Sequence, residues 1–312
     1  MPTKKLVQES KSGVSIGFAG FGLNRQKIDT PDKSAHDGDT IIGRALANVD
    51  VRFLGIDTPE ISFRLPGSKT FVPISDAKWT AFLADPLKGW TGPALPAGLR
   101  NHLAPKFNAR TGPNHAAHAA KARLALVGFI KDDVKNFARG DLQSFTFFLR
   151  YAHDVIDRYG RLLAYINADV SATAKRPLTY NERNLEAGTA LPYFIWPNLD
   201  PFKQQPTLLD AVFAPTDVAR IAADPALKNA RSWVKTARLA GSGVFAKNNP
   251  LIIEPFELRY LAGRRTPDRS VIDLGGKIRH LVAPAEYYRV PNPEDRLFIP
   301  SEFVPLFTAK GW

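Results

Sequence analysis

The 312-residue sequence contains no cysteine and no long hydrophobic run. Without cysteine, the chain has neither disulfide bonds nor thiolate zinc sites, and its redox compartment stays open. No segment approaches the roughly 18 consecutive apolar residues of a membrane-spanning helix. Residues 1–10 carry charge without an apolar segment after them, so we expect no secretory signal peptide and no membrane association. A cytoplasmic location is the default expectation, with export by another route as the alternative.

The chain has fewer acidic than basic side chains. The chain has 42 Lys and Arg against 30 Asp and Glu, which gives a formal net charge of +12. This balance favours a polyanionic partner such as nucleic acid, with simple solubility as the alternative. Residues 251–312 hold nine basic and eight acidic side chains, so +11 of the charge lies in residues 1–250. The hydrophobic content of 44% is that of an ordinary soluble globular protein.

The coarse pattern predicts strands first, followed by strands mixed with helices. Residues 14–55 are strand-like pieces separated by polar turns. Residues 62–112 are rich in Pro and Gly, so we expect an inserted loop region with one short helix near 76–83. Further expected elements are helices at 113–130, 179–188 and 224–239 and strands at 143–151 and 162–166. This order favours the α+β class over a repeating βαβ sheet.

Two short segments contain residues typical of metal-assisted phosphate chemistry. Asp39 lies in the sequence Asp-Gly-Asp-Thr at 37–40, and Asp57, Thr58 and Glu60 follow a short strand-like run. A hard divalent cation prefers carboxylate and carbonyl oxygens, which Asp39, Asp57 and the Thr58 carbonyl provide. Glu60 is placed to accept a proton from a metal-activated water. Taken singly, each piece is more typical of a turn or a helix entry than of a metal site.

Two arginines complete this set. Arg52 offers a planar fork that matches a phosphate, and Arg161, just after a glycine turn, offers a second. Along a straight strand Arg52 and Asp57 would be roughly 17 Å apart, so their convergence requires a strongly curved sheet. Taken alone, Arg161 is a surface arginine beside a turn.

Together these segments resemble the motifs of the staphylococcal nuclease (thermonuclease) family, and they occur in the family's order. The three matching segments are Asp37–Thr40, Val51–Glu60 and Asp157–Ile166. The alanine-rich helix opened by Gly112-Pro113 and two later helical segments are similar to the family's three helices. The resemblance implies an OB-fold, a five-stranded β-barrel with three helices, spanning residues 14–249. It leaves an insertion at about 62–112 and a C-terminal extension, residues 250–312, of unknown role.

The resemblance also implies residue roles. Asp39 and Asp57 would bind Ca²⁺, helped by the Thr58 carbonyl. Glu60 would be the general base, acting directly or through water. The phosphate and the transition state would be bound by two arginines, Arg52 and Arg161.

Substrate contacts are implied for three aromatic residues. Tyr159 matches a family tyrosine near the bound nucleotide. Phe194 and Trp196 fall in the region where family nucleases stack the substrate base, and core packing is the alternative for both.

The predicted activity is a Ca²⁺-dependent, sugar-nonspecific endonuclease that hydrolyses DNA and RNA, preferably single-stranded or unpaired, to 3′-phosphate products. The alternative is a catalytically silent nucleic-acid-binding module, but all five charged residues of the predicted site are present. A third interpretation makes the nuclease part of a larger role, as an antibacterial effector or a scavenging enzyme. The insertion begins directly after Glu60, so it is positioned to cover or narrow the mouth of the site.

Three histidines require separate consideration. His115 and His118 stand three residues apart near a helix start, but no third ligand accompanies them. We therefore expect helix-facing or exposed histidines rather than a metal site. His36 adjoins the Asp-Gly-Asp-Thr sequence, and a phosphate contact there is an alternative to a surface role.

Overall fold

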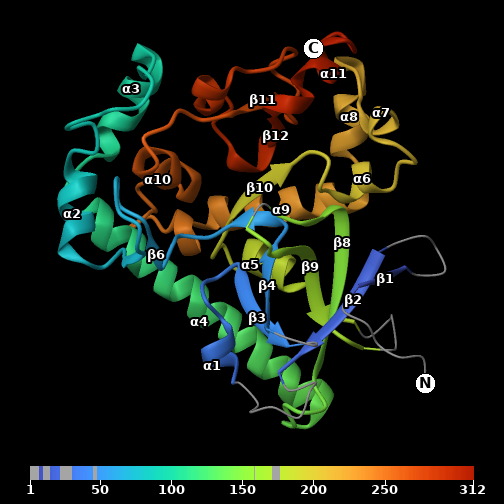
Figure 1. Cartoon of the computed structure of the whole chain (residues 1–312). Helices are drawn as coiled ribbons and strands as arrows, with labels where there is room; N and C mark the ends of the chain where they lie inside the picture. Colours follow the sequence, from blue (N-terminus) through green and yellow to red (C-terminus); the bar gives the residue numbers. More distant parts are fainter. Residues whose placement is uncertain (1–6, 10–14, 22–29, 45–47, 158, 171–175) are drawn as a thin grey trace.

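The computed structural model describes residues 7–9, 15–21, 30–44, 48–157, 159–170 and 176–312. The predicted domain start at Val14 lies outside this set. Helices and strands are mixed, and the strands form three sheets, an architecture compatible with the expected α+β class (Figure 1). No described helix is long and apolar enough to cross a membrane.

The largest sheet has the strand order β1-β2-β3-β4-β9-β8, and β8 also pairs with β2. The pairings therefore return to β2, although among the described residues β2 and β3 pair only at Gly20 and Arg44. β4 and β9 run parallel, and the other neighbours are antiparallel. The strands are β1 (Gln8–Glu9), β2 (Ser15–Gly20), β3 (Thr40–Arg44), β4 (Asn48–Phe53), β8 (Thr146–Ile156) and β9 (Leu162–Ala168).

The second sheet, with the order β11-β12-β10-β5, joins the predicted nuclease region to the C-terminal extension. β10 is antiparallel to β5 and parallel to β12, so the extension continues the sheet that begins beside the predicted site. These strands are β5 (Gly55–Asp57), β10 (Leu191–Ile195), β11 (Arg269–Asp273) and β12 (Arg296–Pro300). A small third sheet in the insertion pairs β6 (Ser62–Phe63) with β7 (Val72–Pro73).

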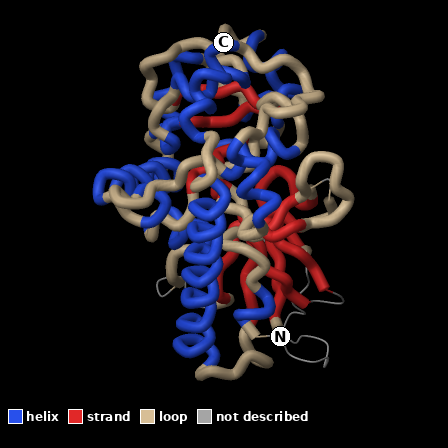
Figure 2. Tube along the Cα trace, turned by 90° about the vertical axis from the view of Figure 1, so that its left-hand side faces the viewer, coloured by secondary structure: helices blue, strands red, loops and turns tan. Residues whose placement is uncertain are grey.

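The three helices predicted at 113–130, 179–188 and 224–239 are present. α4 (Thr111–Ala138) begins two residues before Pro113 and runs along one side of the large sheet (Figure 2). α5 (Tyr180–Glu186) begins at a capping box formed by Thr179 and Glu182, and α9 (Pro225–Ala240) is capped by Asp224. Other helices are α1 (Pro31–Ser34), α2 (Ala77–Ala84), α3 (Ala97–Leu103), α6 (Asp200–Lys203), α7 (Leu208–Ala211), α8 (Val218–Ala222), α10 (Pro255–Ala262) and α11 (Val304–Thr308).

The insertion is more ordered than the sequence predicted. The expected helix near 76–83 is α2, but the expectation of a single helix was wrong, because α3 and the β6–β7 pair also form. The insertion and the extension share one hydrophobic cluster, in which Trp79 and Leu99 pack with Leu258 and Val282. Each segment therefore buries the apolar face of the other.

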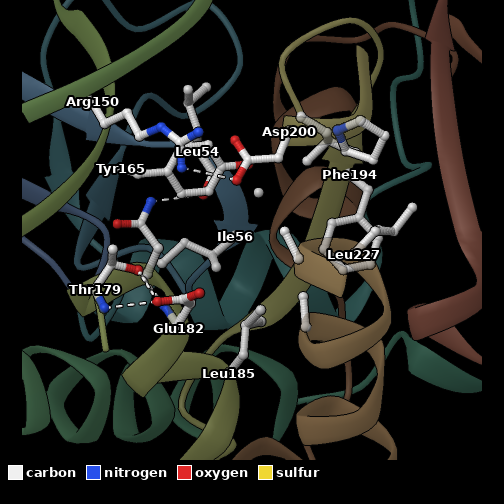
Figure 3. Close-up of a pocket in the computed structure, with 16 residues that line it drawn as sticks. Leu54, Ile56, Arg150, Tyr165, Thr179, Glu182, Leu185, Phe194, Asp200 and Leu227 are labelled. Atoms are coloured by element: carbon white, nitrogen blue, oxygen red, sulfur yellow. Dashed lines mark hydrogen bonds and ion pairs between the residues drawn. The ribbon is translucent and has the colours of Figure 1, made fainter. Parts of the chain in front are cut away.

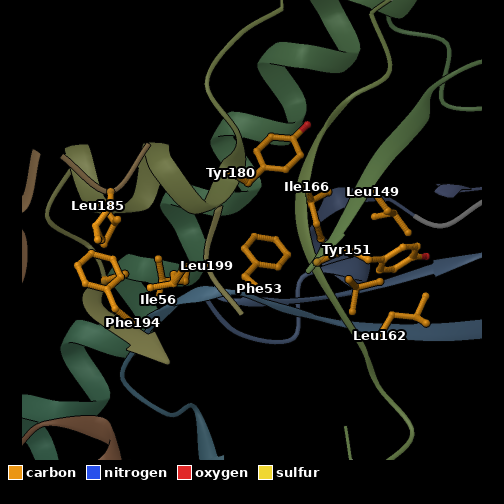
Figure 4. Close-up of a cluster of buried hydrophobic side chains, with 14 of the residues drawn as sticks. Phe53, Ile56, Leu149, Tyr151, Leu162, Ile166, Tyr180, Leu185, Phe194 and Leu199 are labelled. Carbon is orange, nitrogen blue, oxygen red and sulfur yellow. The ribbon is translucent and has the colours of Figure 1, made fainter. Parts of the chain in front are cut away.

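The main hydrophobic core lies between the large sheet, α4, α5 and β10. Figure 4 shows Phe53 at its centre and Phe194 beside Ile56 and Leu185. Every residue labelled in that figure is at most 5% exposed. This core fixes the position of β4 and β5, the two strands from which the predicted site projects.

Candidate active site

Three carboxylates predicted from the sequence lie close together in the fold. Asp39 directly precedes β3, Asp57 ends β5, and Glu60 follows three residues later. They are 1%, 1% and 8% exposed, so all three are removed from bulk water. Buried carboxylates require partners, because the desolvation of an unpaired charge is costly.

Arg52 bridges the two aspartates. Its Nη1 lies 2.9 Å from Asp39 Oδ1, and its Nη2 lies 2.8 Å from Asp57 Oδ1. Burial by itself would lower the pKa of Arg52, but the charges of Asp39 and Asp57 outweigh it and raise that pKa. The three predicted residues therefore form one connected ionic unit.

A turn at Gly55 brings Arg52 and Asp57 together. β4 ends at Phe53, Gly55 has a φ of +76°, and β5 then leaves β4 to pair with β10. Glycine adopts this left-handed conformation without a Cβ penalty. The separation expected along a straight strand therefore does not apply, because the two side chains belong to different strands.

A close backbone approach holds Asp39 in place. A Cβ at Gly38 would lie 2.7 Å from the Ala122 Cβ on α4 and 2.8 Å from the Thr58 Cγ2, so only glycine fits there. The Thr58 N–H donates to Asp39 Oδ2 at 3.1 Å. The two predicted motifs are thus joined through the Asp39 carboxylate. The predicted role of the Thr58 carbonyl as a metal ligand stays a prediction.

A further arginine, which the sequence reasoning missed, comes from the C-terminal extension. Arg259 on α10 donates from Nη1 and Nη2 to the two oxygens of Asp57, each at 2.8 Å. Its Nη1 also lies 2.7 Å from Glu60 Oε1. Arg259 and Glu60 are 199 residues apart in the sequence, so no local spacing points to this contact.

His115 contacts the site through the backbone of Glu60. The Glu60 N–H donates to His115 Nε2 at 2.8 Å, across 55 residues of sequence. Burial lowers the pKa of His115 to about 3, so the imidazole is neutral and Nε2 is free to accept. The expectation of a helix-facing histidine is confirmed, and the structure adds this link to Glu60. His118 instead contacts the Asn249 carbonyl.

The pKa values of two buried acids, Glu60 and Asp37, are raised. Burial raises the pKa of Glu60, against the opposing charges of Arg259 and Arg52. Burial and the neighbouring charges of Asp39 and Glu60 raise the pKa of Asp37 well above its usual range. A raised pKa makes Glu60 a stronger base than an exposed glutamate, as proton abstraction requires.

Arg161 and Tyr159 lie in the turn between β8 and β9. The Arg161 side chain donates from Nε to Asp157 Oδ2 at 2.8 Å, and its Cζ lies 5.6 Å from the centre of the Tyr159 ring. Tyr159 is 69% exposed. Arg161 is thus paired with Asp157, and the Tyr159 ring beside it is largely exposed.

Phe194 and Trp196 are core residues. They are 2% and 0% exposed, and the Trp196 Nε1–H donates to the Ala211 carbonyl at 3.2 Å. Trp196 also packs edge-on against Phe307. Both rings are packed in the hydrophobic core, so core packing describes both, and neither contacts the acidic site.

A separate pocket of about 80 Å³ lies on another side of β5 (Figure 3). The Arg150–Asp200 ion pair, at 3.1 Å, stands at one end and the Thr179–Glu182 pair at the other. The wall between them is largely apolar and includes Ile56. None of the acidic site residues lines this pocket, so it contributes nothing to their chemistry.

The donor chemistry of the acidic site fits a hard cation, because Asp39, Asp57 and Glu60 all present oxygen ligands. As these side chains stand, however, their oxygens accept hydrogen bonds from Arg52 and Arg259. Across the described parts of the chain, no group of three or more such side chains is arranged to hold a metal ion. An ion would therefore have to compete with a guanidinium.

A scan against models of protein families finds none that matches this chain, and a search of curated proteins finds no match either.

Proposed function

We propose that this protein is a metal-dependent phosphodiesterase of the staphylococcal nuclease type, built on an OB-fold barrel and acting on DNA and RNA. The observation that carries the proposal is the convergence of Asp39, Asp57, Glu60 and Arg52 in one buried cluster. The return of the pairing from β8 to β2 supports the barrel, because five strands are then linked in a ring. The net charge of +12 supports a polyanionic substrate.

In the proposed reaction, Glu60 takes a proton from a water as the water oxygen forms a bond to phosphorus. The bond from phosphorus to the 5′ oxygen breaks, and that oxygen takes a proton from solvent water and leaves as a 5′-hydroxyl. The other product keeps a 3′-phosphate. The Arg52 fork stabilises charge on the phosphoryl oxygens. A bound Ca²⁺, held by Asp39 and Asp57, would supply Lewis acidity and a more acidic water.

The alternative is a nucleic-acid-binding module without catalysis. Two contacts favour it: Arg161 is paired with Asp157, and Arg259 holds both oxygens of Asp57. In this alternative, the ion pairs are a structural unit. Binding would then use the positive charge and the exposed Tyr159 ring, for which single-stranded or unpaired nucleic acid is the matching partner.

The proposal is tested by digestion of single-stranded DNA and RNA with millimolar Ca²⁺ or with a chelator, followed by end-group analysis. We expect cleavage with Ca²⁺ only and 3′-phosphate ends. Glu60→Gln should reduce turnover by about 100-fold or more, because it removes the general base. The matched control is Glu302→Gln, which changes an exposed glutamate far along the chain. Cleavage that persists in the chelator would refute metal dependence, and binding without cleavage would establish the alternative.

A further inference from the structure

The Arg259 guanidinium holds the same oxygens that a metal ion would use. Its two terminal nitrogens contact both oxygens of Asp57, and one of them also contacts Glu60 Oε1. The Arg259 side chain is 21% exposed, while that of Asp57 is 1% exposed. The contact is a bidentate fork in a largely dry site, the geometry in which charge-assisted hydrogen bonds are strongest.

Charge makes simultaneous occupation unfavourable. Asp39, Asp57 and Glu60 carry three potential negative charges, and Arg52 and Arg259 supply two positive ones. A divalent cation entering beside Arg259 would face a like charge at about 4 Å, a repulsion that water screens poorly in a buried site. The ion and the guanidinium therefore exclude each other from Asp57.

The helix that presents Arg259 is firmly anchored. On α10, the Glu257 carboxylate lies 2.5 and 2.7 Å from Lys106 Nζ in the insertion. At the start of the helix, Glu254 pairs with Arg296 at 2.9 Å. Only the side chain of Arg259 has to move to release Asp57, and its Cζ already lies 6.0 Å from the centre of the Tyr193 ring, a cation–π partner.

We propose that Arg259 is a tethered competitor of the catalytic cation, so that its guanidinium and a divalent ion bind Asp57 alternately. This inference rests on the proposed metal-dependent function and deepens it. The C-terminal extension then sets the metal concentration at which the site is loaded. Arg259 raises that concentration, because every binding event first breaks its hydrogen bonds.

Calorimetric titration of the full-length protein with CaCl₂, in the absence of nucleic acid, tests the proposal. Arg259→Gln should bind Ca²⁺ about ten-fold more tightly than wild type, the factor expected from losing one charge-assisted hydrogen bond. Arg289→Gln, which removes an exposed arginine paired with Glu286 in the same extension, is the matched control and should leave the affinity unchanged. Equal or weaker binding by the Arg259 variant overturns the competition.

Arg259→Lys gives a second, milder variant. It keeps the charge but loses the fork, so its Ca²⁺ affinity should lie between those of wild type and Arg259→Gln. Thermal melting adds a readout that does not involve turnover: Ca²⁺ should raise the melting temperature of Arg259→Gln more than that of wild type. If wild type and both variants bind no Ca²⁺, the metal-dependent function fails together with this proposal. If they bind with equal affinity, only the competition fails.

Discussion

The contact between Arg52 and Asp57 depends on a single residue between them. Gly55, at a φ of +76°, lets the chain leave β4 and enter β5, which brings two side chains five residues apart to 2.8 Å. The sequence pointed to the members of this cluster, because their residue types suit metal-assisted phosphate chemistry and their motifs resemble those of the staphylococcal nuclease family. It did not supply Arg259, because a contact across 199 residues leaves no periodic or local trace.

His115 is predicted to position Glu60. In His115→Ala the Glu60 N–H loses its buried acceptor, which should cost about 1–3 kcal/mol of stability. We expect a lower kcat with little change in nucleic-acid affinity, because only the proposed base is displaced. His115→Gln, which retains an acceptor, should restore part of the rate.

His118→Ala is the matched control for this prediction. It removes a buried imidazole from the same helix, but that imidazole contacts the Asn249 carbonyl rather than Glu60. Equal losses of kcat in the His115→Ala and His118→Ala variants would show that α4 packing, and not the Glu60 contact, is responsible.

At the scale of elements, the helix expected at 179–188 is α5. It begins at the Thr179 capping box and ends before Gly188, which has a φ of +67°, so both ends are set by the local backbone. α3 was missed because its seven residues are too few for a periodic pattern and include Gly98. Its stability comes from packing against the extension, where His102 stacks on Tyr288 with ring centres 4.6 Å apart.

The turn between β8 and β9 determines how Arg161 can act. In the parallel pairing Arg52 lies opposite Leu163, and Arg161 precedes Leu163 by two residues. Alternate residues face the same side of a sheet, so Arg161 and Arg52 share a face. Rotation of the Arg161 side chain away from Asp157 would bring it towards a phosphate bound by Arg52.

Arg161→Ala should therefore reduce turnover by about 100-fold or more while changing stability little, since its ion pair with Asp157 is partly exposed. Steady-state kinetics and thermal melting measure the two effects. A variant that cleaves at the wild-type rate would assign the second phosphate-binding guanidinium to another residue.

At the scale of the whole molecule, one buried carboxylate joins the insertion to the extension. Burial alone would raise the pKa of Glu257, but the charge of Lys106 and hydrogen bonds from His102, Lys106 and Tyr287 outweigh it and lower the pKa to about 2. A carboxyl with a depressed pKa stabilises the folded state above its unfolded pKa of about 4.5. This contribution is lost as the pH falls from about 4.5 to about 2.

Glu257→Gln should reduce this loss of folding stability at low pH. Chemical unfolding at pH 7, 4.5 and 3 should show a smaller decrease for the variant than for wild type, with a difference on the order of 2 kcal/mol between pH 7 and 3. At pH 7 the variant should itself be less stable, because Lys106 is left without its buried partner. Identical pH profiles would contradict the assignment. Glu302→Gln again serves as the exposed control.

The position of β10 between β5 and β12 affects how the chain folds during its synthesis. β10 pairs with a strand that follows it by roughly a hundred residues, a stretch that a ribosome needs about 5–20 s to synthesise. Until then one edge of β10 has unpaired N–H and C=O groups, which are a template for association with other chains. β12 thus completes the sheet, and the nascent protein depends on this late strand to cover the exposed edge of β10.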